Sequence, residues 1–185
     1  MMNSPLIPFS FAADGCYARA HKMRAILNQY GHECEKLFAF ADDGFLSTNA
    51  PSGCCVWWSW HVAPLVWYKD SQGVTQQAII DPSLFTGPVS VAVWKARLTT
   101  GLCSPYGPAS PRYPTQVRYE QMPGDIYMYW GLHDAGTNPY GGTWASDNTL
   151  AKTNCINNLY SAYSGCTYPA NLSISNCFPP NQPQD

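Results

Sequence analysis

The chain has 185 residues, enough for a single domain that buries its own core. Apolar residues make up 45% and charged residues only 12%, which excludes a disordered chain and favours a globular protein of strands and ordered loops. A net charge of −2 without a cluster of Lys or Arg argues against a nucleic-acid partner or an anionic membrane.

The domain plan expected from this length is one catalytic domain over residues 1–185, with a leader segment at 1–13 and a flexible tail at 179–185. Eight cysteines indicate an oxidising compartment. For this reason we expect a secreted protein. The start of the chain shows no basic region followed by an apolar stretch, so the signal peptide and any pro-region are expected not to be in this sequence. The longest apolar run, residues 56–68, is too short to span a bilayer.

The first predicted helix begins at Asp14, which can act as its N-cap, and runs to about Tyr30, before Gly31. One face carries five apolar residues at helical spacing: Cys16, Ala20, Met23, Leu27 and Tyr30. Cys16 therefore opens the stripe that is expected to be buried.

Arg19 and Lys22 lie away from this stripe and are expected to be surface charges. His21 follows Cys16 by five residues, which places it about 140° further round the helix axis. The geometry argues against a direct pair of Cys16 and His21, and against a metal shared by the two.

Three segments follow the helix. Residues 34–40 are expected to form a strand, and residues 42–53 a loop with two Gly-containing turns. Residues 55–69 form a long aromatic strand, in which Pro64 is expected to cause a bulge or to place the strand at a sheet edge.

A hairpin follows directly. Residues 70–73 (DSQG) read as a turn, and residues 74–80 as the returning strand. A reversal at residue 71 or 72 brings His61 opposite Asp81, or within one register step of it, so their side chains can touch. A histidine on an apolar strand is often a core residue, but the facing aspartate favours a functional pair.

The second half of the chain gives weaker signals. Residues 104–142 are rich in Pro, Gly and Tyr, with one predicted strand at 125–130. A second helix is expected at 148–163, closed by Gly165. From Cys166 onward we expect a disulfide-tied loop.

Cys16 has three possible roles: half of a disulfide, a metal ligand or a nucleophile. A cysteine at a helix N-terminus has its thiolate favoured, and the free N–H groups there can hold an oxyanion. Nucleophilic catalysis also needs an imidazole and a group that orients it, which His61 and Asp81 can supply. No CxxC or HxxxH spacing supports a zinc site.

Several short motifs carry a specific resemblance: DGCYARAHKMR, CEK, CCV-x-WS-x-HVA-x-LV-x-YK, GVT and IIDPSLF. Together they resemble the bacterial protein-glutaminase family of protein-glutamine deamidases, most densely over residues 14–88. The sequence departs from the family in a shorter segment before Cys16, across residues 97–142, and at Trp60, where the family has tyrosine.

The resemblance implies an α+β fold with a papain/transglutaminase-like core, in which an N-terminal catalytic helix packs on an antiparallel sheet with disulfide-tied loops. It also implies Cys16 as nucleophile, His61 as acid and base, and Asp81 as the third member of the triad. We expect Trp58, Ser59 and Trp60 to bind substrate, with the Trp58 indole as an oxyanion donor.

The implied activity is hydrolysis of glutamine side-chain amides in proteins and peptides, without a metal or organic cofactor. The expected partners are glutamine-containing proteins or peptides, and a pro-region that inhibits a monomeric enzyme. The alternatives are a transglutaminase or cysteine protease with the same triad, a secreted deamidase toxin domain, and a disulfide-stapled binding module.

A reduced Cys16 leaves seven cysteines. Cys166 and Cys177 are close enough in sequence for one bridge, and four cysteines can form two more in an undetermined order: Cys34, Cys54, Cys55 and Cys155. Cys103 is then expected to be a second free thiol.

Overall fold

A four-stranded antiparallel sheet lies at the centre of the computed structural model, which describes residues 7–99, 103, 114, 116–128, 146–174 and 177. The strand order is β5-β4-β1-β6. The bounds of the strands are Glu35–Ala41 for β1, Trp60–Lys69 for β4, Thr75–Ile79 for β5 and Val117–Pro123 for β6. Two further strands, β2 (Leu46–Asn49) and β3 (Cys55–Trp58), pair with each other in a small second sheet.

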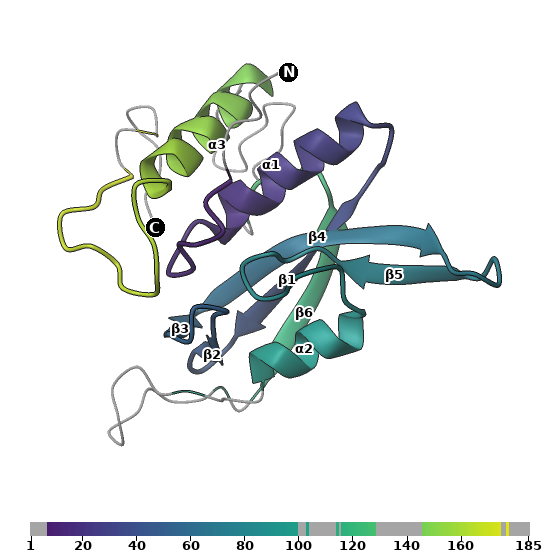
Figure 1. The fold of residues 1–185 in the computed structure, drawn as a ribbon, viewed down its shortest axis with the longest axis horizontal. Helices are drawn as coiled ribbons and strands as arrows, with labels where there is room; N and C mark the ends of the chain where they lie inside the picture. Colours follow the sequence, from purple (N-terminus) through teal and green to yellow (C-terminus); the bar gives the residue numbers. More distant parts are fainter. Residues whose placement is uncertain are drawn as a thin grey trace.

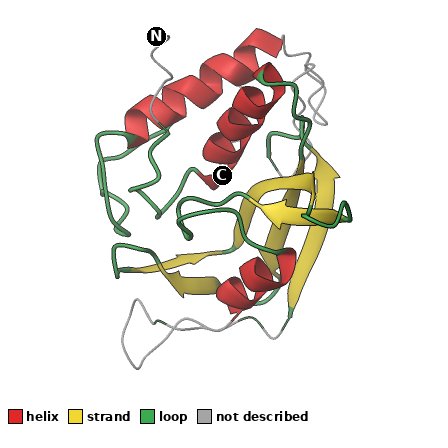
Figure 2. Cartoon of the chain, turned by 45° about the vertical axis from the view of Figure 1, so that its right-hand side comes forward, coloured by secondary structure: helices red, strands yellow, loops and turns green. Residues whose placement is uncertain are grey.

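Helices cover the main sheet on both sides. Helix α1 (Cys16–Gln29) packs on β4 and against α3 (Ser146–Tyr160), whereas α2 (Val91–Thr99) contacts β2 and β5. Figure 1 shows α1 and α3 together above the sheet and α2 below it. Figure 2 shows the same separation after a 45° turn. The expected α+β class, with the N-terminal helix packed on an antiparallel sheet, is confirmed.

The start of α1 is set by Gly15 rather than by Asp14. Gly15 is the N-cap residue, with φ 79°, and no side chain caps the helix. A Cβ at this position would come within 2.5 Å of the Tyr160 ring, so both the left-handed backbone and the close approach require glycine. Asp14 instead accepts hydrogen bonds from the Tyr160 hydroxyl and the Gly15 N–H, each at 2.5 Å.

The buried face of α1 differs from the predicted stripe. The first two turns are buried all round, because α3 covers the side that the sheet leaves open, and Tyr30 is 76% exposed. Arg19 and Lys22 were expected at the surface, and this is wrong. The Arg19 guanidinium donates to the carbonyls of Phe11 and Asp14, and the Lys22 ammonium donates to the Asn154 amide oxygen.

The long aromatic strand expected at 55–69 is divided at Ser59 into β3 and β4. Pro64 lies in β4 between two neighbouring strands, so the expected edge position is wrong. Pairing of β4 with β5 extends only from Leu65 to Lys69, and at Pro64 the carbonyl accepts the Ile80 N–H. Proline has no N–H, so Pro64 takes part in this contact through its carbonyl oxygen alone.

Several elements were missed or misplaced. Strand β2 lies inside the expected loop at 42–53, and α2 was not predicted. In the region where a strand was expected at 125–130, the strand is instead β6, at one edge of the main sheet. Residues 125–128 form a turn and a short bridge, and residues 129–130 lie outside the described residues. Helix α3 begins and ends two to three residues earlier than expected, and Gly165 pairs with Phe11 instead of closing it.

The N-terminal segment is part of the fold where it is described. Phe11 is fully buried among the residues of α1 and α3, and Ala12 donates its N–H to the Gly165 carbonyl. Residues 1–6 and the expected tail at 179–185 lie outside the described residues. Within the described part, no helix has the length and hydropathy needed to cross a membrane.

Three disulfides are present, as expected in number but not in pairing: Cys54–Cys166, Cys55–Cys103 and Cys155–Cys177. The expected bridge between Cys166 and Cys177 and the free Cys103 are both wrong. Adjacent residues at a strand start point to opposite sides, so Cys54 and Cys55 reach different partners. The two free thiols are Cys16 and Cys34, both buried.

Thiol labelling tests this arrangement. Under denaturing, non-reducing conditions, we expect two labelled cysteines per chain, and peptide mapping should place them at Cys16 and Cys34. Before denaturation Cys34 should react slowly, because burial raises the pKa of its thiol. Label on Cys103 would contradict the disulfide pattern.

Candidate active site

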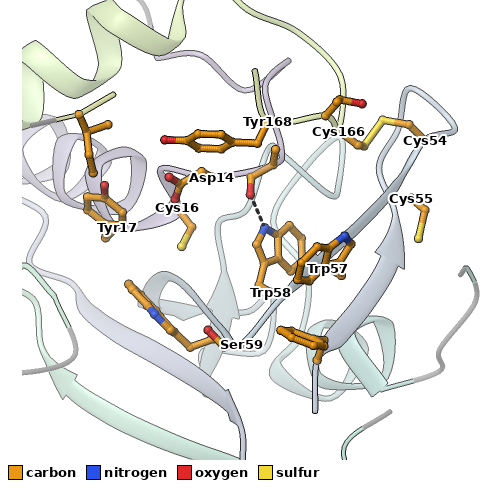
Figure 3. A pocket seen from close by; sticks show the side chains of 15 residues that line it. Asp14, Cys16, Tyr17, Cys54, Cys55, Trp57, Trp58, Ser59, Cys166 and Tyr168 are labelled. Atoms are coloured by element: carbon orange, nitrogen blue, oxygen red, sulfur yellow. Dashed lines mark hydrogen bonds between the residues drawn. A yellow bond between two sulfur atoms is a disulfide. The ribbon is translucent and has the colours of Figure 1, made fainter. Parts of the chain in front are cut away.

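Cys16 is the first residue of α1 and lies on the wall of a cavity of about 850 Å³ (Figure 3). Its side chain is nearly buried, with 5% exposed. The N–H groups in the first turn of a helix have no intrahelical acceptor, and the helix dipole adds partial positive charge there. These N–H groups can donate to an oxyanion that forms beside Cys16.

The hairpin of β4 and β5 brings His61 and Asp81 together. Leu65 pairs with Ile79, and His61 and Asp81 each lie an even number of residues beyond that pair, so their side chains share one face of the sheet. His61 Nε2 and Asp81 Oδ2 are 2.8 Å apart, and both side chains are buried.

Asp81 receives two more hydrogen bonds. The Ser83 hydroxyl donates to Oδ1 at 2.5 Å, and the Trp94 indole N–H donates to Oδ2 at 2.9 Å. Burial on its own raises the pKa of Asp81, but the charge of His61 and the three hydrogen bonds together lower it below its usual range. Asp81 is therefore a fixed carboxylate that faces His61.

Two indoles contact the His61 ring. Trp58 stacks on it at 4.5 Å between ring centroids with 14° between the planes, and Trp94 lies at 5.9 Å and 25°. Aromatic faces favour a cation placed against them. Burial on its own lowers the pKa of His61, but the charge and hydrogen bond of Asp81, together with those of Cys16, raise it from 6.5 to about 9. The geometry therefore favours imidazolium at neutral pH.

Trp58 does not have the role expected for its indole N–H. The N–H donates to the carbonyls of Ala12 and Ala13, at 3.1 and 3.2 Å, so it is not free to hold an oxyanion. Figure 3 shows one of these two bonds as a dashed line from the Trp58 indole. These bonds connect the segment before Cys16 to β3. Trp58 instead positions two parts of the site, since its ring also packs on His61.

The cavity beside Cys16 is largely aromatic. Ser59 and Trp60, both expected at the substrate site, line it, and Ser59 is exposed. The other lining residues are Ala13, Asp14, Tyr17, Phe45, Cys54, Cys55, Trp57, Trp58, Cys166, Thr167, Tyr168 and Ile174. The Cys54–Cys166 disulfide forms part of the wall and joins the β2–β3 sheet to the loop after α3.

His21 belongs to a different environment from Cys16, as the helical spacing predicted. Its Nδ1 lies 2.9 Å from the Lys36 ammonium, and both side chains are buried. Burial and the nearby Lys36 charge lower the pKa of His21 to about 2, and burial lowers the pKa of Lys36 to about 7. Among the described residues, no group of three or more His, Cys, Asp or Glu side chains could hold a metal ion.

Known proteins are similar to this chain in sequence and in fold. The family model described as Glutaminase matches residues 1–98. A crystal structure of a protein-glutaminase is 38% identical, with a TM-score of 0.73, and the match covers 95% of this chain and 84% of that one. The chain belongs to the protein-glutaminase family.

Two other solved protein-glutaminase structures agree with this assignment. The NMR structure of the protein-glutaminase from Chryseobacterium proteolyticum is 38% identical, with a TM-score of 0.70 and the same coverage of 95% and 84%. A pro-protein-glutaminase is 39% identical, with a TM-score of 0.72, and the match covers 95% of this chain and 56% of that one. No curated protein sequence matches the chain.

Four of the six site residues predicted from the sequence line this cavity of the protein-glutaminase fold: Cys16, Trp58, Ser59 and Trp60. His61 and Asp81 form a buried pair that does not line it, and His61 interacts with Cys16. Sequence reasoning missed Ser83 and Trp94, which fix Asp81, and Tyr160, which holds Asp14. Ser83 lies two residues from Asp81, and this short spacing was an available signal. Trp94 and Tyr160 reach the site through tertiary packing, for which the local pattern gives no signal.

The pKa of His61 predicts the pH above which the activity should fall. Since its folded pKa is about 9 and its ordinary value is 6.5, protonation of His61 stabilises the fold fully below about pH 6.5, and this stabilisation is lost as the pH rises through 9. We expect kcat/KM to fall on the alkaline side with a midpoint near pH 9 in a pH–rate profile. A rate that stays level through pH 10.5 would contradict a catalytic imidazolium.

Proposed function

We propose that this protein hydrolyses the side-chain amide of glutamine residues in proteins and peptides, giving glutamate and ammonia, with Cys16, His61 and Asp81 as its catalytic triad. The observation that carries the proposal is the hydrogen-bonded His61–Asp81 pair beside a cysteine that begins a helix and faces a cavity. Membership of the protein-glutaminase family supports the same chemistry.

The reaction proceeds in two halves. The Cys16 thiolate attacks the glutamine side-chain carbonyl carbon, and a C–S bond forms. His61 then gives its proton to the amide nitrogen, and the C–N bond breaks. Ammonia departs, and the acyl group remains bound to Cys16 as a thioester. In the second half His61 accepts a proton from water, whose oxygen attacks the thioester. The C–S bond breaks, glutamate leaves, and the thiolate–imidazolium pair is restored.

The surroundings of the triad support these steps. The Cys16 backbone N–H is placed to donate to the oxyanion, because it lies in the first turn of α1. Asp81 accepts the His61 Nε2–H, which leaves Nδ1 for the reacting groups. The two indoles that pack against His61 support one orientation of its ring.

The cavity suits a glutamine that is part of a polypeptide. Its volume of about 850 Å³ exceeds what one glutamine side chain fills, and aromatic side chains line much of it. Neighbouring residues of a peptide can therefore lie on Trp57 and Trp60 while the amide reaches Cys16. We also propose that the enzyme is monomeric and that it is secreted; the three disulfides support secretion. The similarity to a pro-protein-glutaminase supports the proposal that an inhibitory pro-region precedes the mature enzyme.

Incubation with a glutamine-containing peptide tests the function. We expect ammonia release together with a mass increase of about 1 Da, the difference between an amide and an acid, and no cleavage of the peptide backbone. The same assay with an added primary amine separates the alternatives, since a transglutaminase would join the amine to the peptide. Amine incorporation as fast as hydrolysis would reassign the enzyme, and backbone cleavage would make it a protease.

A further inference from the structure

The cavity beside Cys16 carries a single fixed charge among the described residues. Among the residues that the structure describes, Asp14 is the only Asp, Glu, Lys or Arg that lines it. In Figure 3, Asp14 lies between Cys16 and Tyr168, next to the nucleophile. Burial is the main cause that raises the pKa of Tyr17 and of Tyr168, and the negative charge of Asp14 is the second cause for both. The charge of Asp14 therefore reaches both tyrosines in the cavity wall.

The Asp14 carboxylate is fixed by hydrogen bonds from uncharged groups, which do not cancel its negative charge. Its two hydrogen bonds come from neutral donors, the Tyr160 hydroxyl and the Gly15 N–H. Arg19 is nearby, but its guanidinium donates to the backbone carbonyl of Asp14 and to that of Phe11. In the described part of the chain, no Lys or Arg side chain forms an ion pair with this carboxylate. The structure fixes the carboxylate but leaves its charge available to a substrate.

Aromatic rings accompany this charge. Tyr168 is 45% exposed beside Asp14, and Trp57 and Trp60 are half-buried in the same cavity. Aromatic faces and a carboxylate both attract a cation, and both disfavour an anion. The long side chains of Lys and Arg can lie along a ring while their charged ends reach a carboxylate.

We propose that Asp14 is a specificity-determining residue that selects glutamines with a Lys or Arg beside them in the polypeptide and disfavours glutamines beside Asp or Glu. This inference rests on the proposed function, because it concerns the same cavity. It has a second consequence at the end of the reaction. The product is a carboxylate formed next to Cys16, and the like charge of Asp14 weakens its binding and favours its release.

Three peptides that differ only beside the glutamine provide the test: the two residues that flank the glutamine are both Lys in the first, both Ala in the second and both Glu in the third. With the wild-type enzyme we expect kcat/KM for the Lys peptide to exceed that for the Glu peptide by about fivefold to tenfold at low salt. Added salt should reduce the ratio, because it screens charges that are in contact with solvent. In Asp14→Asn, which keeps the size of the side chain and one acceptor oxygen, the ratio should fall to about onefold to twofold.

Asp70→Asn is the matched control, since it removes the same charge from the exposed turn between β4 and β5, at the far end of β4 from Trp60 (Figure 1). This variant should keep the wild-type ratio. Equal rates for the three peptides in the wild-type enzyme would overturn the inference and leave the proposed function standing. No turnover of any peptide would overturn the proposed function itself. If Asp14→Asn fails to fold, the salt dependence of the wild-type ratio decides, and a ratio that salt leaves unchanged would reject an electrostatic origin.

Discussion

Replacing Cys16 with alanine is expected to abolish ammonia release from a glutamine peptide while the protein stays folded. The substitution removes one sulfur atom from a side chain that is 95% buried, so a loss of about 1 kcal/mol in the free energy of unfolding is expected. In the proposed mechanism no other group can replace Cys16, because its sulfur forms the covalent bond to the substrate. Loss of a triad nucleophile lowers turnover on the order of 10⁵ to 10⁶.

Cys34→Ala provides the matched control, since Cys34 is the other free thiol and lies away from the cavity of Cys16. It should keep wild-type turnover. Iodoacetamide should inactivate the wild-type enzyme and Cys34→Ala at the same rate, with one label at Cys16. Ammonia release should be followed together with thermal unfolding of each variant. Turnover at the wild-type rate in a folded Cys16→Ala variant would end the assignment of the nucleophile.

Asp81→Asn is expected to lower turnover on the order of 10² to 10³ while preserving the fold. In a serine-protease triad the equivalent change costs about 10⁴, and a thiolate–imidazolium pair depends less on its third member. Asparagine keeps the shape of the side chain but removes the charge that raises the pKa of His61. The alkaline limit of the pH–rate profile should therefore move to lower pH in this variant.

The surroundings of Asp81 make the prediction specific. Its carboxylate accepts from His61, Ser83 and Trp94, whereas an amide has only one acceptor oxygen for these three donors. Trp94→Phe removes one donor and keeps an aromatic ring, so its loss of turnover should be smaller, about tenfold. Full pH profiles of kcat/KM for the three proteins provide the measurement. Unchanged turnover and an unchanged alkaline limit in Asp81→Asn would remove Asp81 from the triad.

Local patterns in the sequence were sufficient to predict the His61–Asp81 pair. The turn at 70–73 fixes the hairpin register, and the register brings the two side chains together. The position of Cys16 at a helix start was predicted as well, although its cap is Gly15 rather than Asp14. Both features depend on neighbours within a few residues or across one turn, and such interactions leave a readable pattern.

Other features depend on segments far apart in the chain, which the pattern does not encode. Tyr160 comes from α3 to hold Asp14, and Trp94 comes from α2 to hold Asp81. The burial of Arg19 and Lys22 likewise follows from α3 packing on α1, not from their own helix. The disulfide pairs were unpredictable for the same reason, since Cys54 and Cys166 are 112 residues apart.

The strand order has a consequence for how the molecule is made. The three residues of the proposed triad all precede residue 82. Strand β6, which pairs with β1 along its whole length, and α3, which covers α1, both come after residue 116. A nascent chain that ends after α2 would thus contain the triad and still leave β1 as an open edge, exposed to pairing with other chains. Gly15 would also lack the Tyr160 ring that packs against it. Catalytic competence should therefore appear only late in synthesis, when the C-terminal third has folded back over the first.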